Sequence, residues 1–260
     1  MNKPHPTSLN NPPLLEMFVE IRFRTKLPGD AVYGFAYPVL IKHFKESTGL
    51  PVLNMPADIR NTDQNLRYQP HYQFSGGSPL QCQIGPSVIM FKYQRYAPRE
   101  EIAYPGWSKY IQGFVVMVLE DLFSILQIEM IERIGIRYLD FFNDDKVKNF
   151  FDMINPVITF PGRTISKAGI TCTIDEGEMA HIINLSDNAT FQQQVGDSYI
   201  TQRKGSLIDI DTAITGLDTK IFMANCADTL SRMHAGNKTL FYEIMKDSLA
   251  ELYEPIYDKE

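Results

Sequence analysis

Apolar and polar positions alternate near the start of the chain, which predicts a β-strand over residues 14–26. Side chains on one face of this strand are apolar and those on the other face are mixed and charged. The apolar face carries Met17, Val19, Ile21 and Phe23, and the other carries Phe18, Glu20, Arg22 and Arg24. This strand is therefore expected to cover a hydrophobic core with one face only.

A helix over residues 31–46 is expected next, because residues 28–30 read Pro-Gly-Asp and Asp30 is a suitable N-cap. Pro38 lies inside this helix and should kink or divide it. The expected buried stripe consists of Val32, Phe35, Ala36, Val39, Leu40 and Phe44. Residues 51–66 alternate short apolar and polar stretches, and we interpret them as a strand followed by a loose connection.

An antiparallel meander follows, with strands near residues 68–75, 80–84 and 88–93 separated by glycine-rich turns. Apolar positions then recur with helical spacing over residues 107–127. Trp107 begins this helix, where its ring is expected to anchor the helix on the sheet. The first half of the chain thus has the order strand, helix, meander, long helix.

The second half repeats this order. A strand is expected over residues 130–142 and a short helical stretch over residues 145–154. Up to four strands then follow, near residues 169–174, 180–185, 192–202 and 205–211, with turns at 175–177, 186–188 and 203–205. A helical region over residues 218–254 closes the chain, and the pair Gly236 and Asn237 predicts that it is broken or bent near residues 234–237.

A short sequence echo supports duplication: residues 19–23 read Val-Glu-Ile-Arg-Phe and residues 134–138, 115 positions later, read Ile-Gly-Ile-Arg-Tyr. The predicted fold class is α+β, a pseudo-duplicated unit whose extended antiparallel sheet carries helices on one face. The expected organisation is a flexible segment over residues 1–13, a first repeat over 14–129 and a second over 130–260. The two repeats are expected to form one compact unit.

Composition is that of a globular protein, with 260 residues of which 44% are hydrophobic and 22% are charged. The net charge of −6 works against nonspecific binding to nucleic-acid phosphates, although a local basic patch is compatible with it. Neither a signal peptide nor a membrane span is indicated. Cys82, Cys172 and Cys226 are far apart and odd in number, which favours reduced thiols and a cytoplasmic location.

Several short motifs in the right order resemble one sporadically distributed family of uncharacterised prokaryotic proteins about 250 residues long. The motifs are Asn11-Pro12-Pro13-Leu14-Leu15-Glu16, Glu20-Ile21-Arg22-Phe23, Tyr104-Pro105-Gly106-Trp107, Arg133-Ile134-Gly135-Ile136-Arg137-Tyr138, Asp209-Ile210-Asp211 and Met233-His234 with Phe241. The resemblance spans nearly the whole chain and departs at Asn237, where such proteins often have an apolar residue. It implies a prokaryotic or phage origin and suits a role in mobile-element conflict or phage defence.

Asp209 and Asp211 flank Ile210 in a predicted strand, so their carboxylates share one face. Such a pair could bind a divalent metal or divide acid and base roles, with His181 or His234 as a further ligand. The alternative is a solvated strand face or pairing with an arginine.

Arg22 and Arg137 hold equivalent positions in the two repeats. Two guanidinium groups could clamp a phosphate or carboxylate ligand. A structural salt bridge to a carboxylate of the adjacent strand, present twice, explains the repetition more simply.

Residues 91–99 interleave aromatic and basic side chains, a composition typical of a stacking platform for nucleotides or single-stranded nucleic acid. The candidate residues are Tyr93, Arg95, Tyr96 and Arg99. An edge strand leaving the sheet through a surface loop is the competing interpretation.

No common nucleotide-binding, hydrolase or zinc-protease motif occurs in the sequence. We therefore expect a non-enzymatic, cytoplasmic binding or interaction protein without a cofactor, whose partner is a protein or small ligand and which could form a homodimer. The alternatives are a metal-dependent enzyme centred on Asp209 and Asp211, and a nucleic-acid or nucleotide sensor.

Overall fold

The computed structural model describes residues 5–95, 103–143, 145–157, 161, 167–195 and 198–257. Contacts divide the chain into two interleaved units. Unit 1 consists of Met1–Glu16, Arg137–Thr212 and His234–Glu260, and unit 2 consists of Met17–Ile136 and Ala213–Met233. This division does not follow the predicted repeat boundaries at residues 14–129 and 130–260, and the organisation into two repeats that form one compact unit stays a prediction.

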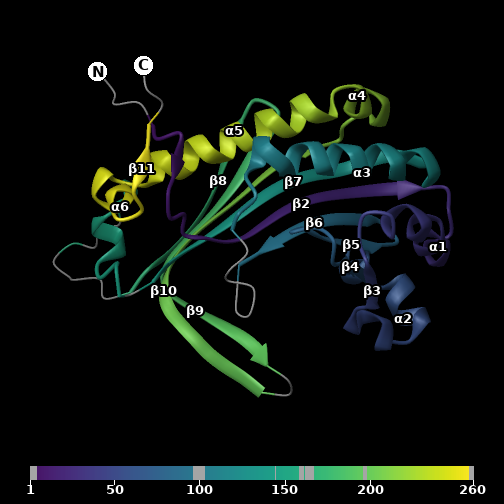
Figure 1. The fold of residues 1–260 in the computed structure, drawn as a ribbon, viewed down its shortest axis with the longest axis horizontal. Coiled ribbons are helices and arrows are strands. Elements are labelled where there is room, and N and C mark those ends of the chain that lie inside the picture. The colour runs from purple at the N-terminus through teal and green to yellow at the C-terminus, as the bar shows by residue number, and fades with distance from the viewer. Residues whose placement is uncertain are drawn as a thin grey trace. The chain divides into compact units, whose positions relative to one another are not determined.

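The fold class is α+β, as predicted. Nine strands form one antiparallel sheet in the order β3-β4-β5-β6-β2-β7-β10-β9-β8, and helices α3 (Gln112–Ile125) and α5 (Cys226–Ile244) pack against it (Figure 1). The strands are β2 (Leu14–Thr25), β3 (Glu46–Gly49), β4 (Tyr72–Ser75), β5 (Gln81–Gly85), β6 (Val88–Gln94), β7 (Ile128–Asn143), β8 (Gly169–Glu176), β9 (Met179–Val195) and β10 (Ser198–Thr215).

The strand order is symmetric about the β2–β7 pair except for β3, which lies outside β4 and has no described counterpart beyond β8. Outward from β2 the neighbours are β6, β5 and β4, and outward from β7 they are β10, β9 and β8. Each set of strands is followed in the chain by a long helix, α3 or α5. This order is the one expected from two copies of a strand, meander and helix unit, and the sequence echo between residues 19–23 and 134–138 falls on its two central strands. The duplication itself stays a prediction.

Unit 2 begins with β2, whose burial alternates as the sequence predicts. Helix α1 (Gly29–Leu40) differs from its prediction at its N-cap and in its buried stripe, and of the two effects expected of Pro38, a kink or a division, the division is absent. Asp30 lies in its first turn and Pro28 is the N-cap, Pro38 does not divide the helix, and Phe35 is 48% exposed. The helix ends at Leu40, two residues after Pro38, and a turn then leads into β3.

The segment predicted as a strand and a loose connection is helical. It forms a 3₁₀ turn Pro51–Asn54, the short helix α2 (Ala57–Thr62) and a second 3₁₀ turn Gln64–Leu66. Pro51 stands at the start of the first turn and Pro56 immediately precedes α2. Proline favours helix starts, because its fixed φ is already helical and its missing N–H would have no partner there.

In unit 1, β9 and β10 are longer than predicted and run through the expected turns at residues 186–188 and 203–205. Gly205 is the instructive case. A Cβ atom at this position would overlap the carbonyl oxygen of Phe142, so its glycine permits close approach of two strands instead of forming a turn.

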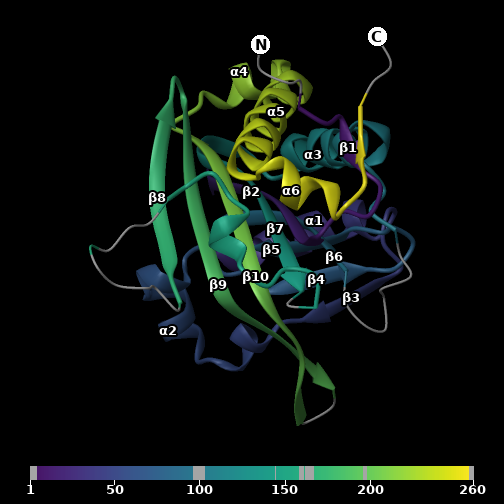
Figure 2. The same cartoon turned by 90° about the vertical axis from the view of Figure 1, so that its left-hand side faces the viewer.

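The helical region was predicted to be broken or bent at residues 234–237, and the break is wrong, because α5 continues through them. The Asn237 side chain is buried and donates hydrogen bonds to the Ile210 carbonyl oxygen (2.9 Å) and to Thr212 Oγ1 (3.0 Å). Both acceptors belong to β10, the strand that passes beside α5 (Figure 2). This position therefore serves packing against the sheet and not helix termination. The other closing helices are α4 (Thr219–Ala224) and α6 (Asp247–Glu251).

The N-terminal segment predicted to be flexible contains a short strand. β1 (Ser8–Leu9) pairs with β11 (Pro255–Ile256), and Leu9 is buried in the core of unit 1. Among the described residues, no helix is long and apolar enough to span a membrane.

Candidate functional site

Arg137 forms a salt bridge with a carboxylate of the adjacent strand. Its Nε and Nη2 atoms donate to the two Asp209 carboxylate oxygens at 2.7 and 2.8 Å, and Asn184 Nδ2 donates to Asp209 Oδ2 at 3.2 Å. The bond to Asp209, followed by the nearby Asp209 and Asp211 charges, raises the pKa of Arg137 against the effect of burial. Arg137 is thus occupied by a scaffold contact in unit 1.

Arg22, the equivalent residue, is also paired, in a network within unit 2. Its Nε atom lies 2.8 Å from Glu20 Oε1, which also accepts from Arg133 at 2.7 Å. The Arg22 guanidinium lies over the Tyr68 ring, 4.8 Å from its centroid. Both arginines are therefore held by carboxylates, and a ligand at either one stays a prediction.

Asp209 and Asp211 have different surroundings although they share a strand. Asp209 is buried and accepts the hydrogen bonds from Arg137 and Asn184, whereas Asp211 is half-buried. The two candidate histidines bond elsewhere: His181 Nδ1 lies 2.9 Å from Thr212 Oγ1, and His234 Nδ1 lies 3.0 Å from Tyr138 Oη. In the described part of the chain, no group of three or more His, Cys, Asp or Glu side chains could hold a metal ion.

The aromatic and basic segment does not offer Tyr93 as a stacking surface. Tyr93 is fully buried on β6, its ring packs edge-on against Tyr104 at 5.3 Å, and burial raises its pKa. Arg95 is exposed just beyond β6. Tyr96 and Arg99 lie outside the described residues.

Trp107 is buried, as its predicted anchoring role requires.

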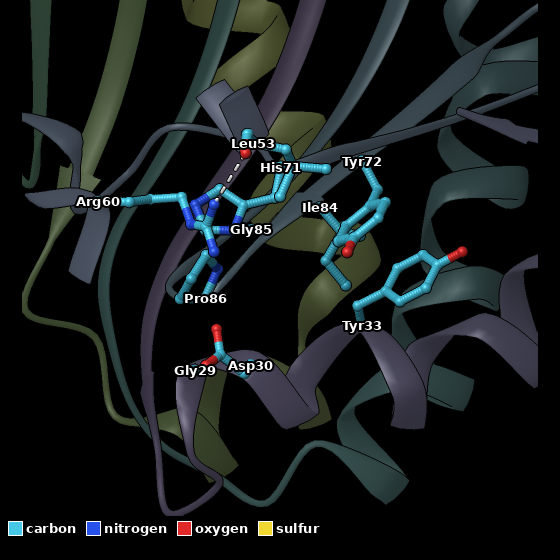
Figure 3. Close-up of a pocket in the computed structure, with 10 residues that line it drawn as sticks. All are labelled: Gly29, Asp30, Tyr33, Leu53, Arg60, His71, Tyr72, Ile84, Gly85 and Pro86. Atoms are coloured by element: carbon cyan, nitrogen blue, oxygen red, sulfur yellow. Dashed lines mark hydrogen bonds between the residues drawn. The ribbon is translucent and has the colours of Figure 1, made fainter. Parts of the chain in front are cut away.

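A small pocket in unit 2 unites residues that the sequence does not single out. Its volume is about 240 Å³. Its walls come from the first turns of α1, the 3₁₀ turn Pro51–Asn54, helix α2, the start of β4, the end of β5 and the turn that follows β5 (Figure 3). The polar side chains that line it include those of Asp30, Arg60 and His71, with Tyr33 and Tyr72 beside them. A cavity of this size suits a ligand smaller than a typical drug molecule.

Arg60 reaches the pocket from α2, and only some of its N–H groups have hydrogen-bond acceptors in the described structure. Its Nη1 atom donates to the carbonyl oxygens of Leu53 (3.2 Å) and Met55 (3.3 Å), which fixes the guanidinium group. Its Nε atom is buried without a hydrogen-bond partner in the described structure. A buried donor without an acceptor costs about 1–3 kcal/mol, so this atom favours an acceptor supplied from the pocket.

His71, at the entry to β4, lies beside Arg60 in the pocket wall and is 6% exposed (Figure 3). Its Nε2 atom is likewise buried, and no described residue bonds to it. Burial and then the positive charge of Arg60 lower the pKa of His71, whereas the negative charge of Asp30 opposes them. The ring is therefore neutral at neutral pH, with one nitrogen that donates and one that accepts.

Asp30 brings a negative charge to the opposite side of the pocket (Figure 3). It projects from the first turn of α1, and within the described residues neither Asp30 nor Arg60 forms an ion pair. The rings of Tyr33 and Tyr72 stack with centroids 3.6 Å apart and form an aromatic wall. The pocket thus offers one positive charge, one negative charge and an aromatic surface.

Gly85 allows two backbone segments of the pocket wall to lie close together. A Cβ atom at this position would overlap the carbonyl oxygen of Gln69 and would lie 3.1 Å from Val88 Cγ1. Only glycine allows the backbone of β5 to approach residue 69 so closely. This contact fixes the course of the chain immediately before His71.

The sequence did not reveal this pocket because Arg60 lies in the segment interpreted as a strand and loose connection, His71 lies in a predicted meander strand, and Asp30 has the position of a helix cap. The prolines before Arg60 were a usable signal for helical turns.

A comparison with models of known protein families and with the curated protein sequences found no match.

Proposed function

We propose that this chain is a binding protein that holds a small zwitterionic ligand, of the chemical class of the free α-amino acids, in the pocket of unit 2. The observation that carries this proposal is the pair of buried nitrogen atoms, Arg60 Nε and His71 Nε2, that lack partners in the described structure. Natural proteins rarely leave buried polar atoms unsatisfied, so such a pair calls for a ligand or water.

The polar groups define what the ligand must present. A carboxylate would accept hydrogen bonds from Arg60, since a guanidinium group and a carboxylate form short, charge-assisted bonds. An ammonium group would face Asp30, whose carboxylate forms no ion pair with a described residue. The volume of about 240 Å³ leaves room for a small side chain against Tyr33 and Tyr72.

A binding role also agrees with the expectation from the sequence, in which no catalytic motif occurs. On the polar face of β2, Glu20 and Arg22 are already bonded to each other, and Glu20 is also bonded to Arg133 of β7. Unsatisfied donors favour the pocket over this face as a ligand site.

A thermal-shift screen with the free α-amino acids tests the proposal. At least one of them should raise the unfolding temperature in a concentration-dependent manner, because a ligand that binds only the folded state stabilises it. Arg60→Met should abolish the shift. Arg67→Met is the matched control, since Arg67 pairs with Glu132 and does not line this pocket. A chain that no amino acid stabilises, or a shift that survives Arg60→Met, would contradict the proposal.

A further inference from the structure

Strand β8 ends the sheet on its unit 1 side and has an open edge. It pairs with β9 in the register Gly169↔Ser186 to Glu176↔Met179, and no other described strand adjoins it. The opposite edge strand, β3, is only four residues long and reads Glu-Ser-Thr-Gly. Proteins often blunt their edges with short, polar strands, and β8, at eight residues, is not blunted in this way.

The outward backbone groups of β8 follow from its pairing. The Asp187 N–H donates to the Ala168 carbonyl oxygen, one pair beyond Gly169↔Ser186. Hydrogen bonds of an antiparallel ladder alternate by two residues, so the even-numbered residues of β8 bond to β9. The odd-numbered residues therefore direct their N–H and C=O groups away from the sheet, namely Gly169, Thr171, Thr173 and Asp175.

The side chains of β8 add an apolar stripe to this edge. Ile170, Cys172 and Ile174 share the face of their cross-strand partners Leu185, Ile183 and His181, which are buried. Ile170 packs against the core of unit 1, whereas Cys172 is exposed and Ile174 is 41% exposed. The apolar face of unit 1 thus extends from the buried core to exposed side chains at the edge strand β8.

The sequence of β8 is complementary to itself in one antiparallel register. Placing Cys172 opposite Cys172 of a second copy puts Ile170 opposite Ile174 of that copy, and Thr171 opposite Thr173 of that copy. Apolar residues then face apolar residues, and threonine faces threonine, both favourable cross-strand pairs. Lys167, just before β8, comes to lie diagonally across from Asp175 of the second copy, so the charges match as well.

We infer that β8 is a self-association surface, at which two copies of this chain pair antiparallel around Cys172 to continue the sheet. The occupant is a second copy because apolar, threonine and charged positions are all satisfied by the same strand. Only the odd-numbered residues would form the new hydrogen bonds, and Cys172 would be a non-hydrogen-bonded pair. In such pairs the two Cβ atoms lie about 4.5–5.5 Å apart, close enough for a small movement to allow a disulfide.

Sedimentation equilibrium under reducing conditions, combined with cysteine trapping, tests this inference. The chain should form a dimer, and copper–phenanthroline in air should remove two electrons and two protons from the facing thiols to link them. Cys82 and Cys226 are buried, so Cys172→Ser should abolish the covalent dimer. A chain that is monomeric at all concentrations, or a dimer that cannot be trapped through Cys172, would overturn the inference.

Thr173→Pro distinguishes edge pairing from other modes of association. The Thr173 N–H points outward, so proline removes an intermolecular bond in each copy while leaving the pairing with β9 intact. The dissociation constant should rise at least about tenfold, and Thr173→Ala should have little effect. Circular dichroism checks that Thr173→Pro folds. If Thr173→Pro does not fold, Ile174→Lys is used instead, because dimerisation would bury its charge in the apolar stripe. Dimerisation unchanged by the variant that folds would also overturn the inference.

Discussion

Arg137 on β7 binds Asp209 on β10 through two parallel hydrogen bonds of 2.7 and 2.8 Å. The Asp209 side chain is 4% exposed and that of Arg137 is 45% exposed, so the pair is a buried carboxylate capped by a half-exposed cation. Among the described residues, the carboxylate partner of Arg22, at the equivalent position, is Glu20, a neighbour on its own strand. One repeated motif thus performs two different structural tasks.

Arg137→Ala should destabilise the fold by about 2 kcal/mol, because it leaves the Asp209 carboxylate buried with only Asn184 as its side-chain partner. Arg22→Ala is the matched control from the other repeat. It should cost less than about 1 kcal/mol, since Arg22 is part-exposed and Glu20 keeps Arg133. Urea denaturation measures both free energies of unfolding, and equal losses would contradict the distinction.

Some features of this fold are specified by the local sequence and others depend on residues that are distant in the sequence. The alternation in β2 predicts both the strand and its buried face, because a period of two with one apolar face has few alternative structures. Gly205 and Asn237 were misread as a turn and a helix terminator. Their roles depend on Phe142 and Thr212, which lie far away in the sequence, so local propensity could not reveal them.

Asp140 predicts an unusual pH dependence of stability. It is 6% exposed on β7, and burial, followed by the nearby charge of Asp209, raises its pKa to about 8. Its charge in turn adds to the effect of burial in raising the pKa values of Tyr242 and Tyr253. The folded state therefore keeps a proton on Asp140 that the unfolded chain releases above about pH 4.

This contribution to the free energy of unfolding is fully present below about pH 4 and declines up to about pH 8, at no more than about 1.4 kcal/mol per pH unit. Asp140→Asn should remove the decline and stabilise the chain at alkaline pH. Denaturation of both chains across this pH range measures the difference. A difference that does not change with pH would show that Asp140 is not titrating in this way.

Asn237→Leu should destabilise the chain by about 1–3 kcal/mol. The substitution removes the donor for the Ile210 carbonyl oxygen and for Thr212 Oγ1, which leaves both acceptors without this bond inside the fold. Asn225→Leu is the control, because Asn225 is exposed and its described side-chain hydrogen bond is to the Ile221 carbonyl oxygen, four residues earlier. The unfolding temperatures of the two variants decide the matter, and a more stable Asn237→Leu chain would contradict the prediction.

Gly85→Ala should weaken any ligand binding in the pocket and lower stability. The added methyl group meets the backbone at Gln69, which must move together with the nearby His71. Gly34→Ala is the matched control, because a Cβ atom there meets nothing within 4 Å. Alanine at position 34 also favours the helix, by about 1 kcal/mol. Parallel thermal denaturation of the two variants measures the contrast, and equal stability would contradict the contact at Gln69.

The pocket illustrates the limit of prediction for the candidate site. Asp30, Arg60 and His71 are ordinary residues at unrelated spacings, and no motif joins them. They meet because helical turns replace the predicted loose connection and because Gly85 admits the backbone before His71. Burial of the Arg60 and His71 nitrogens, which gives the pocket its chemical character, follows only from the folded arrangement.

Isothermal titration calorimetry with one stabilising amino acid and its des-amino carboxylic acid tests the central claim most directly. Asp30 is exposed and forms no bond with a described side chain, so Asp30→Asn should leave the fold intact. The variant should bind the amino acid at least about tenfold more weakly than the original chain does, while its affinity for the carboxylic acid should not fall. Equal losses for both compounds, or no loss for the amino acid, would contradict zwitterion binding between Arg60 and Asp30.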